Sequence, residues 1–427
     1  MTAPPAKPAA MYREPDWDAE HRLVDGGEPE ALAGSDGSSG LSGYTSDTRQ
    51  GTGPAGSDGS SGLSGLMWTV LGDVRDHLAR YVLPLSDMDL DVLTLWCAHT
   101  HLLGTTYTTP RLCLTSPLPE SGKTTVLEHF QRLCHHPLAM ASAGSPALFS
   151  RMLAVGVRTL MIDEADRNLR PDREGVEDVL AILNTGYKRG GCRPVLERNK
   201  DTWEVVEHPT FAPLVMAGIA PDLPDDTMSR TIVITMLPDT AGVIAESDWE
   251  LIDEHTVALG ERLAVTAAQC FDLVRAADPE LPAECVGRMR EKWRPLARIA
   301  AAAGDDWLAR CVALIVRDIT ERQHQREEGL VRELPEIALL RDLMDEWPPG
   351  VELWPTEAMR QALVTRHSER WGVSDRFPKG LTVQRLGRYL SRTFRIHTVR
   401  QSIGDQRVRG YLYDDVHAVA VRLGAGS

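Results

Sequence analysis

Apolar and polar residues alternate with two different periods along the middle of the chain. Between residues 66 and 103 the apolar positions recur at helical spacing, which predicts two helices. Short apolar runs then alternate with helical stretches, and this alternation predicts an α/β fold with a parallel sheet. The predicted strands are the run that begins at residue 112 and the runs 138–142, 159–162, 211–219 and 231–236, and the predicted helices between them are 126–133, 145–155 and 176–183.

The first 65 residues have a different composition. They are rich in Gly, Ser, Pro, Ala and Asp and poor in large apolar side chains, which is typical of disordered segments. The sequence AGSDGSSGLSG occurs at 33–43 and again at 55–65. A repeat this short and polar cannot bury a core between its copies, so residues 1–65 are predicted to be a flexible tail.

The stretch 112–125 carries the clearest chemical signal. An apolar run, a loop that closes on Ser-Gly-Lys-Thr and a helix-forming stretch are typical of the strand, phosphate loop and helix of P-loop nucleotidases. In this motif backbone N–H groups surround the phosphates, Lys123 supplies a positive charge and the Thr124 hydroxyl can bind Mg²⁺. Pro117 stands where the usual pattern has its first glycine. The predicted nucleotide-binding residues are Pro119, Glu120, Ser121, Gly122, Lys123, Thr124 and Thr125.

A second motif supports the first. The run 159–166 is an apolar strand that ends in Asp163 and Glu164. Asp163 is predicted to hold Mg²⁺ through water and Glu164 to act as the general base, with ATP and Mg²⁺ as cofactors. A buried strand capped by solvated acids is the alternative for this run alone. Because the strand 138–142 separates the two motifs, we expect them on strands that are not consecutive, as in the additional-strand ATPases that include helicases and AAA+ motors.

Cationic residues follow the helix 176–183. Residues 184–191 break that helix with glycines, and strands at 193–196 and 202–206 are predicted to form a hairpin. In ring motors such a hairpin points into the central pore, where cations bind DNA phosphates. A solvated loop of mixed charge is the alternative. The candidate DNA-binding residues here are Lys188, Arg189, Arg193, Arg198 and Lys200.

Two further arginines are candidates for the ATP site. Arg230 lies just before the strand 231–236, where clamp loaders and ring helicases carry an arginine finger that completes a neighbouring subunit's site. The alternative is an ion pair with a local carboxylate such as Asp225. Arg288 lies in the helical region 246–304, which is predicted to form a lid. It is a candidate sensor that contacts the nucleotide or, equally, one half of a surface salt bridge.

The C-terminal part predicts a separate fold that binds nucleic acid. Helices at 337–347, 356–367 and 382–393, followed by a two-stranded hairpin within 397–413, are typical of a winged helix. Between residues 381 and 413 seven arginines stand against one carboxylate, Asp405, which favours contact with DNA phosphates. A winged helix that contacts protein is the alternative. The arginines predicted to bind DNA are Arg385, Arg388, Arg392, Arg407 and Arg409.

Composition narrows the classes of function. The chain has 46 basic and 61 acidic side chains and a net charge of −15, which excludes a protein coated with positive charge but allows a local basic face. Its seven cysteines include no Cys-x-x-Cys pair, so neither a disulfide framework nor a zinc site is predicted. With no apolar run of membrane length and no signal peptide, we expect a cytoplasmic protein without a membrane partner.

Five segments together resemble an uncharacterised ATPase domain family of phage and mobile-element replication proteins. Members are often described as helicase-like and can be fused to a primase-polymerase domain. The resemblance spans roughly residues 70–420 and implies an AAA+-like or superfamily-three-like ring ATPase, a homo-oligomer and by expectation a hexamer, that acts on DNA. Residues 1–65 are too few and too polar for a primase domain. The five segments are 96–102, 115–125, 183–190, 223–230 and 293–296.

These inferences divide the chain and define competing functions. The predicted parts are a tail (1–65), an ATPase core with N-terminal helices (66–240), a helical lid (241–330) and a winged-helix-like domain (331–427). The leading hypothesis is an ATP-hydrolysing DNA helicase or translocase of phage or mobile-element replication. An ATP-dependent replication initiator or helicase loader that does not unwind DNA is one alternative, and an ATP-switched defence or signalling scaffold is another.

Overall fold

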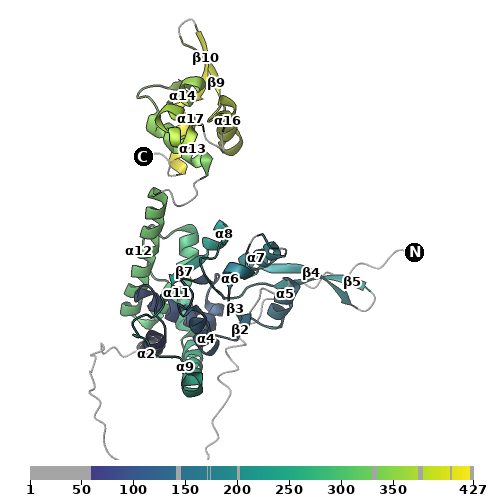
Figure 1. The fold of residues 1–427 in the computed structure, drawn as a ribbon, viewed down its shortest axis with the longest axis vertical. Coiled ribbons are helices and arrows are strands. Elements are labelled where there is room, and N and C mark those ends of the chain that lie inside the picture. The colour runs from purple at the N-terminus through teal and green to yellow at the C-terminus, as the bar shows by residue number, and fades with distance from the viewer. Residues whose placement is uncertain are drawn as a thin grey trace, which may run out of the picture. The chain divides into compact units, whose positions relative to one another are not determined.

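The computed structural model describes residues 59–140, 146–170, 172–173, 175–199, 202–328, 334–373, 378–403 and 406–423. The chain divides into two compact units, Met1–Ile319 and Thr320–Ser427 (Figure 1). The sequence predictions for residues 1–58, Lys200 and Asp405 lie outside the described residues. No helix in the described ranges is both long enough and apolar enough to cross a bilayer.

The first unit is built on a parallel sheet of five strands. Their spatial order is β2-β3-β6-β1-β7, which confirms the prediction of an α/β fold with a parallel sheet. Because β6 lies between β1 and β3, the two motif strands are not neighbours, and that prediction is confirmed as well. The strands are β1 (Arg111–Thr115), β2 (Pro137–Met140), β3 (Thr159–Ile162), β6 (Leu214–Gly218) and β7 (Thr231–Thr235).

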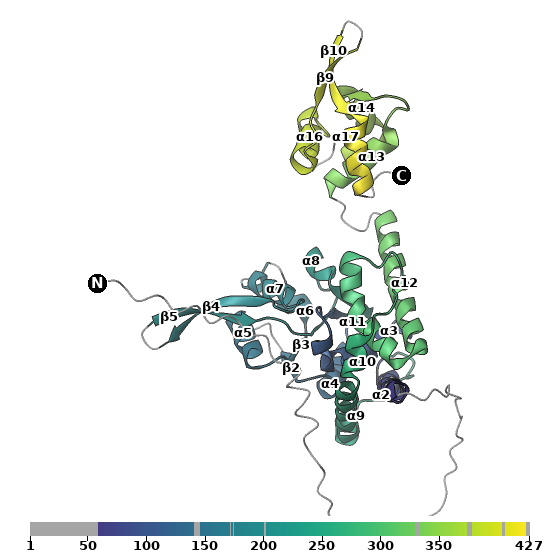
Figure 2. The same ribbon diagram turned by 180° about the vertical axis from the view of Figure 1, so that it is seen from behind.

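Helices cover both faces of this sheet (Figure 2). Leu112 and Leu114 belong to one buried apolar cluster, and Cys113, which points the other way, belongs to another. The first cluster includes residues of α2 (Gly59–Tyr81), α3 (Met88–His101), α4 (Lys123–Leu133), α9 (Trp249–Gln269), α10 (Phe271–Ala276), α11 (Gly287–Ala303) and α12 (Asp305–Glu327). The second includes residues of α5 (Pro146–Val155), α6 (Ala165–Asn168) and α7 (Val176–Thr185).

Two features differ from the expected division of this unit. Helix α2 begins at Gly59, inside the predicted tail, and Leu63 already packs against the first cluster. The region predicted as a separate lid, 241–330, shares that cluster with α2, α3 and β1, so α9 and α11 are part of the core. Helical periodicity identified these helices but carries no information on which partner covers their apolar faces.

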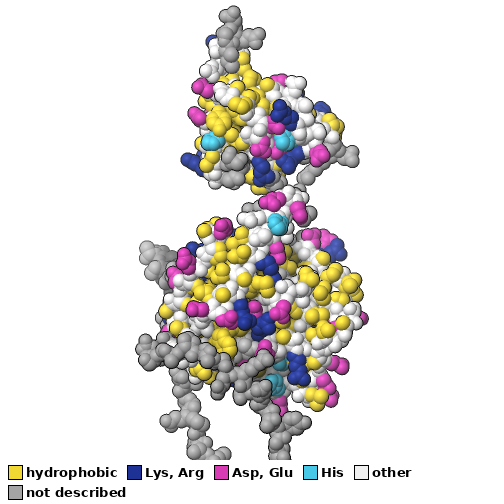
Figure 3. Space-filling model, turned by 90° about the vertical axis from the view of Figure 1, so that its left-hand side faces the viewer, with side chains coloured by type: hydrophobic (Ala, Val, Ile, Leu, Met, Phe, Trp, Pro, Cys, Tyr) yellow, Lys and Arg dark blue, Asp and Glu magenta, His cyan; other side chains and the backbone are white. Residues whose placement is uncertain are grey.

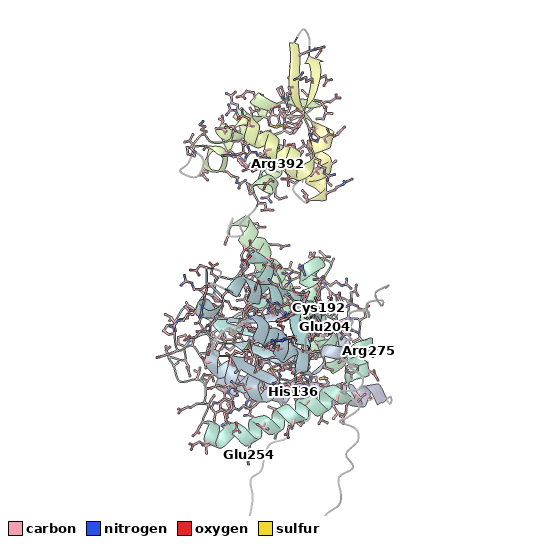
Figure 4. The ribbon with its side chains drawn as sticks, turned by 90° about the vertical axis from the view of Figure 1, so that its right-hand side faces the viewer. His136, Cys192, Glu204, Glu254, Arg275 and Arg392 are labelled. Carbon is pink, nitrogen blue, oxygen red and sulfur yellow. The ribbon has the colours of Figure 1, made fainter. Side chains whose placement is uncertain are left out.

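A two-stranded antiparallel hairpin extends from this unit (Figure 1). It consists of β4 (Cys192–Asn199) and β5 (Thr202–Pro209), as the sequence predicted. One face of the hairpin exposes the apolar side chains Leu196, Val205 and Trp203, with Leu196 opposite Val205 and Trp203 opposite Arg198. Figure 4 shows Cys192 and Glu204 on its two strands.

The second unit has its own core and a three-stranded antiparallel sheet in the order β8-β10-β9. The three predicted helices and the hairpin are present. Strand β8 and helix α17 were not predicted, and β8 is too short to give an alternating pattern. In the core the Asp342 carboxylate accepts hydrogen bonds from Arg370 and from the Trp371 indole. The elements are α13 (Pro335–Glu346), β8 (Leu353–Pro355), α14 (Thr356–Arg366), α15 (Ser368–Trp371), α16 (Val383–Arg388), the π-helical turn η2 (Tyr389–Thr393), β9 (Val399–Ile403), β10 (Gln406–Leu412) and α17 (Tyr413–Arg422).

Candidate functional site

A lysine held by two serines lies where β1 gives way to α4. Gly122 is the N-cap of α4 and has a φ of 76°, a left-handed conformation that favours glycine. Lys123 then opens the helix, and its ammonium donates hydrogen bonds to the hydroxyls of Ser121, at 2.9 Å, and Ser116. The turn therefore holds a cation at the amino end of a helix, where backbone N–H groups and the helix dipole also favour an anion.

The surroundings of Lys123 lower its pKa. Partial burial is the main cause, because it disfavours the charged form, and the carboxylates of Asp163 and Asp166 act in the opposite direction. An anion beside this ammonium would favour the charged form and raise the pKa of Lys123 again. The site therefore has one unit of positive charge to offer to a ligand.

Asp163 connects this turn to the end of β3. The Thr124 hydroxyl donates a hydrogen bond of 3.0 Å to one carboxylate oxygen of Asp163, and the Glu164 backbone N–H donates one of 2.8 Å to the other. Glu164 has a φ of 50°, and its exposed carboxylate forms an ion pair with Arg167 at 2.9 Å. The two predicted motifs therefore meet, with Asp163 facing the lysine turn and Glu164 turned toward Arg167.

Asp166 contacts the residue that follows β6, which the sequence did not indicate. Its carboxylate accepts a hydrogen bond of 3.1 Å from the Ile219 backbone N–H, directly after β6. A Cβ on Gly218 would lie 2.6 Å from that carboxylate oxygen, so the close approach requires glycine. A carboxylate from α6 (Ala165–Asn168) therefore lies at the carboxyl end of β6.

A cavity of 580 Å³ opens beside the lysine turn. One part of its wall is apolar, and Ser247 and several carboxylates complete it. The sequence missed this wall because it comes from the end of α2 and from residues 237–247, which carry no motif of their own. The lining residues are Tyr81, Leu83, Glu120, Ser121, Gly122, Lys123, Thr124, Thr125, Glu128, Leu237, Asp239, Ile244, Ala245, Glu246 and Ser247. Of the predicted nucleotide-binding loop residues only Pro119, which is exposed, does not line it.

Buried histidines lie behind the cavity. The rings of His77 and His129 share a hydrogen bond of 3.0 Å, and the second nitrogen of His129 lies 3.1 Å from the Ser247 hydroxyl. Burial lowers the pKa of His77 to about 4 and that of His129 to about 3. The pair is therefore neutral in the folded chain at neutral pH.

Arg230 and Arg288 lie near the amino ends of the parallel strands, whereas Lys123 follows the carboxyl end of β1. The Arg230 carbonyl accepts from the backbone N–H of Arg111, the first residue of β1, whereas Lys123 follows the other end of that strand. A strand of five residues spans about 16 Å, so neither arginine belongs to the cavity of its own chain. Arg288 pairs with Glu291 at 2.9 Å, which is the surface salt bridge considered from the sequence as the equal alternative to a nucleotide contact.

Arg230 is held against its own chain. Its side chain is 14% exposed, donates to the Asp226 carbonyl and lies 3.6 Å from the Asp226 carboxylate. The guanidinium carbons of Arg230 and Arg288 lie 5.8 Å and 5.9 Å from the centre of the Tyr187 ring. The local ion pair considered from the sequence is present, with Asp226 as the partner.

Most cations around the hairpin are also engaged. Lys188 pairs with Glu291 at 2.7 Å, and Arg189 donates to the Leu103 carbonyl at 2.7 Å. Arg193 lies 3.6 Å from the Asp178 carboxylate, while Arg198 is exposed on the hairpin. The first three therefore have partners within the fold, and a contact of these cations with DNA phosphates stays a prediction.

In the second unit, three of the predicted arginines line one cavity of 870 Å³ between α16 and the hairpin. They are Arg388, Arg392 and Arg409, and Figure 4 marks Arg392. Arg385 instead donates to the Gly380 carbonyl at 3.0 Å, and Arg407 is exposed on β10 outside the lining. His397 and Gln384 complete a polar surface with an excess of positive charge. Figure 3 views this unit from the opposite side to Figure 4 and shows Lys and Arg side chains interspersed with Asp and Glu.

Comparisons with known proteins give one family and several distant structures. The model of a family described as "Protein of unknown function (DUF3631)" matches residues 245–422. No curated protein matches the sequence. Two apo structures of the C-terminal region of NrS-1 are each 12% identical, with a TM-score of 0.38, over 81% of this chain and 75% of theirs. A third structure of that region is 11% identical, with a TM-score of 0.34 over the same shares.

Proposed function

We propose that this protein is an ATP-hydrolysing ring ATPase that acts on DNA, as a helicase or translocase of the kind used in phage or mobile-element replication. Its first unit would be a P-loop nucleotidase of the additional-strand, AAA+-like class. One observation carries the proposal: Lys123, the Thr124 hydroxyl and the Asp163 carboxylate converge beside a cavity of 580 Å³. The strand order, with one strand between β1 and β3, supports the same class.

The cavity suits a nucleoside triphosphate in one orientation. The apolar wall with Tyr81, Leu83 and Ile244 offers a surface for the base, and the turn before α4 offers N–H groups and Lys123 for the phosphates. The carboxylates in the lining would repel phosphates elsewhere in the cavity. Together these features favour placing the phosphates at the lysine turn.

The oxygens of Thr124 and Asp163 fit Mg²⁺, which prefers hard oxygen ligands and usually binds through one or two carboxylates plus phosphates. The described residues contain no cluster of three or more His, Cys, Asp or Glu residues arranged to hold a metal ion alone, so a divalent ion would be shared with the nucleotide. When bound, Mg²⁺ would neutralise charge on the phosphate oxygens.

Glu164 is the candidate general base, directly after Asp163. Its carboxylate pairs with Arg167, and both side chains are more than half exposed, at 56% and 72%. Exposed pairs of this kind contribute at most about 1 kcal/mol, so the carboxylate can leave Arg167 at little cost to accept a proton from water.

Two arguments extend the proposal to a ring on DNA. Arg230 lies beside the first residue of β1, and the lysine turn follows the last residue of that strand, which spans about 16 Å. A role for this cation in hydrolysis therefore requires a neighbouring subunit. In the second unit, whose helices and hairpin resemble a winged helix, Arg388, Arg392 and Arg409 line one surface suited to DNA phosphates.

ATP turnover by the full chain, with and without single-stranded DNA, tests the proposal. Lys123→Ala should abolish turnover, whereas Lys379→Ala, which changes an exposed lysine of the second unit, should not. Wild-type turnover in Lys123→Ala would refute the ATPase assignment. A strand-displacement assay then separates the alternatives, because DNA-stimulated hydrolysis without unwinding would indicate an initiator or loader.

A further inference from the structure

We infer that the concave surface between Tyr107 and α11 binds single-stranded nucleic acid, with a base against the tyrosine and phosphates on Arg290 and Arg294. This inference rests on the proposed function, for which it supplies a nucleic-acid contact on the first unit. The surface is a cavity of 410 Å³. Its lining residues are Thr106, Tyr107, Thr108, Gly287, Arg290, Glu291, Arg294, Pro295 and Arg298.

Three arginines form a row along one side of the cavity. Arg290, Arg294 and Arg298 are four residues apart on α11, so they lie on one helix face at steps of about 6 Å. A row of cations along a helix can follow the regularly spaced charges of a nucleic-acid backbone. The overall charge of the chain is −15, so this row is a local exception.

The charges of this row are only partly compensated. Arg298 donates hydrogen bonds to the carbonyls of Ala277 and Thr105, at 2.8 Å and 2.7 Å. These neutral acceptors hold the side chain in place but do not neutralise its charge. Arg294 pairs with Asp278, and both side chains are solvent-accessible. Arg290 is exposed and makes no ion pair within the described parts of the chain.

Glu291, the carboxylate in the lining, does not cancel this charge. One of its oxygens pairs with Lys188 at 2.7 Å and the other with Arg288 at 2.9 Å. Two cations therefore share one acid at the edge of the cavity. Lys188, which the sequence suggested as a direct contact to DNA, instead fixes the wall and leaves a positive excess there.

Tyr107 is an exposed aromatic side chain on a rigid loop. Its ring is 63% exposed, but its carbonyl accepts a hydrogen bond of 2.9 Å from the Arg189 backbone. The next residue, Thr108, pairs with Lys188 in a β-bridge and donates to the Glu291 carbonyl at 2.7 Å. Because the backbone that carries the ring is held in this way, only the side chain of Tyr107 has to be ordered when a base stacks on it.

The combination of groups favours a single strand over other anions. Stacking on an aromatic ring together with cations for the backbone is the usual way that proteins bind unpaired nucleic acid without sequence preference. In a duplex the bases are already stacked on one another, so Tyr107 would have no free base face to contact. A phosphate alone would use the arginines but would gain nothing from the tyrosine.

The test is the affinity of the full chain, without nucleotide, for a fluorescently labelled oligothymidylate strand. Tyr107→Ala should weaken binding by roughly tenfold, because one stacked base contributes about 1–3 kcal/mol, and Tyr107→Phe should bind like wild type. Arg290→Ala should weaken binding several-fold and reduce the slope of log K against log salt by about 0.7. Arg262→Ala, which removes an exposed arginine of α9, is the matched control and should change neither.

Three outcomes would overturn the inference. They are wild-type affinity in both Tyr107→Ala and Arg290→Ala, equal losses in Arg262→Ala, or displacement of the strand from this surface by inorganic phosphate alone. Thermal melts of each variant exclude unfolding as the cause of a loss. Lys123→Ala separates this inference from the proposed function: it should lose ATP turnover yet bind the strand, so the two ideas fail in different variants.

Discussion

Thr124 and Asp163 are 39 positions apart in the chain, yet the threonine hydroxyl donates a hydrogen bond of 3.0 Å to the aspartate carboxylate. The two residues follow different strands, β1 and β3, and β6 lies between those strands. The contact therefore depends on the order of the whole sheet. It is the reason for treating the two sequence motifs as one site.

The first prediction concerns this pair. Thr124→Ala should raise the Mg²⁺ concentration needed for half-maximal ATP turnover by at least roughly tenfold, because one of two protein oxygens near the ion is removed. Thr124→Ser keeps the hydroxyl and should remain close to wild type. Turnover measured across a Mg²⁺ titration checks both, and an unchanged titration in Thr124→Ala would show that the hydroxyl does not serve a metal ion.

The second prediction concerns the close contact between β6 and Asp166. In Gly218→Ala the new methyl group would lie 2.6 Å from the Asp166 carboxylate and 2.9 Å from its backbone nitrogen. The backbone and side-chain shifts needed to avoid this overlap should lower the free energy of unfolding by roughly 1–3 kcal/mol. Gly72→Ala is the control, since Gly72 lies in α2 with no atom within 4 Å of an added Cβ, and it should stabilise by up to about 1 kcal/mol. Urea denaturation measures both, and equal effects would contradict the contact.

The third prediction concerns acid sensitivity. The unfolded chain should protonate His77 and His129 near pH 6.5, whereas in the folded chain burial lowers their pKa values to about 4 and about 3. Positive charge on His255 and Arg80 lowers the pKa of His77 further. Positive charge on His77 and Arg132 does the same for the pKa of His129. The unfolded state therefore binds more protons, and stability should fall as the pH drops from about 6.5 toward 4.

Urea denaturation at a series of pH values tests the acid sensitivity. Each histidine that stays neutral in the folded chain changes the free energy of unfolding by up to about 1.4 kcal/mol per pH unit. His77→Phe should flatten the dependence below pH 6.5. His324→Phe, at an exposed position on α12, is the control substitution. A slope in His77→Phe that equals that of the wild type would assign the sensitivity to other groups.

Local motifs explain which parts of the site were predictable. Gly122, Lys123 and Thr124 are contiguous, and their chemistry dictates their spacing, so the sequence identified them. Tyr81 and Ser247 line the same cavity but come from distant segments, and only the packing of α2 and α9 around α4 brings them together. Such residues carry no signal in a single sequence.

Arg288 illustrates a different limit. A further strand, 138–142, stands between the two motifs in the sequence, so their strands were expected not to be consecutive. That β6 separates them, and at which end of the strands a later helix begins, was not visible in the sequence. Arg288 opens α11 beside Arg230 and Tyr187, about one strand length from Lys123. Periodicity predicted the helix correctly and gave no position for its first residues.

The fourth prediction follows from the distance between Arg230 and its own cavity. If the proposed ring forms, Arg230→Ala should lose ATP turnover although the cavity of each chain is intact. Mixing it with inactive Lys123→Ala chains should restore part of the turnover, because some interfaces then combine a complete cavity with an intact Arg230. Asp226→Asn controls for loss of the local ion pair, and full activity of Arg230→Ala would leave the arginine a structural role only.

The fifth prediction concerns the arginine surface of the second unit, where Arg388 and Arg392 lie one helical turn apart and line the same cavity. The double change to alanine should weaken DNA binding and reduce the salt slope by about one for each phosphate that is no longer neutralised, because counterions are released only where cations meet phosphates. Arg366→Ala, which alters an exposed arginine that pairs with Glu346 in the same unit, removes a similar charge outside that surface. If Arg366→Ala reduced the salt slope by as much per charge removed as the double change, net charge would explain the effect. An unchanged slope in the double variant, with Tyr107→Ala still reducing strand affinity, would place the DNA-binding surface on the first unit alone and favour a second unit that binds protein.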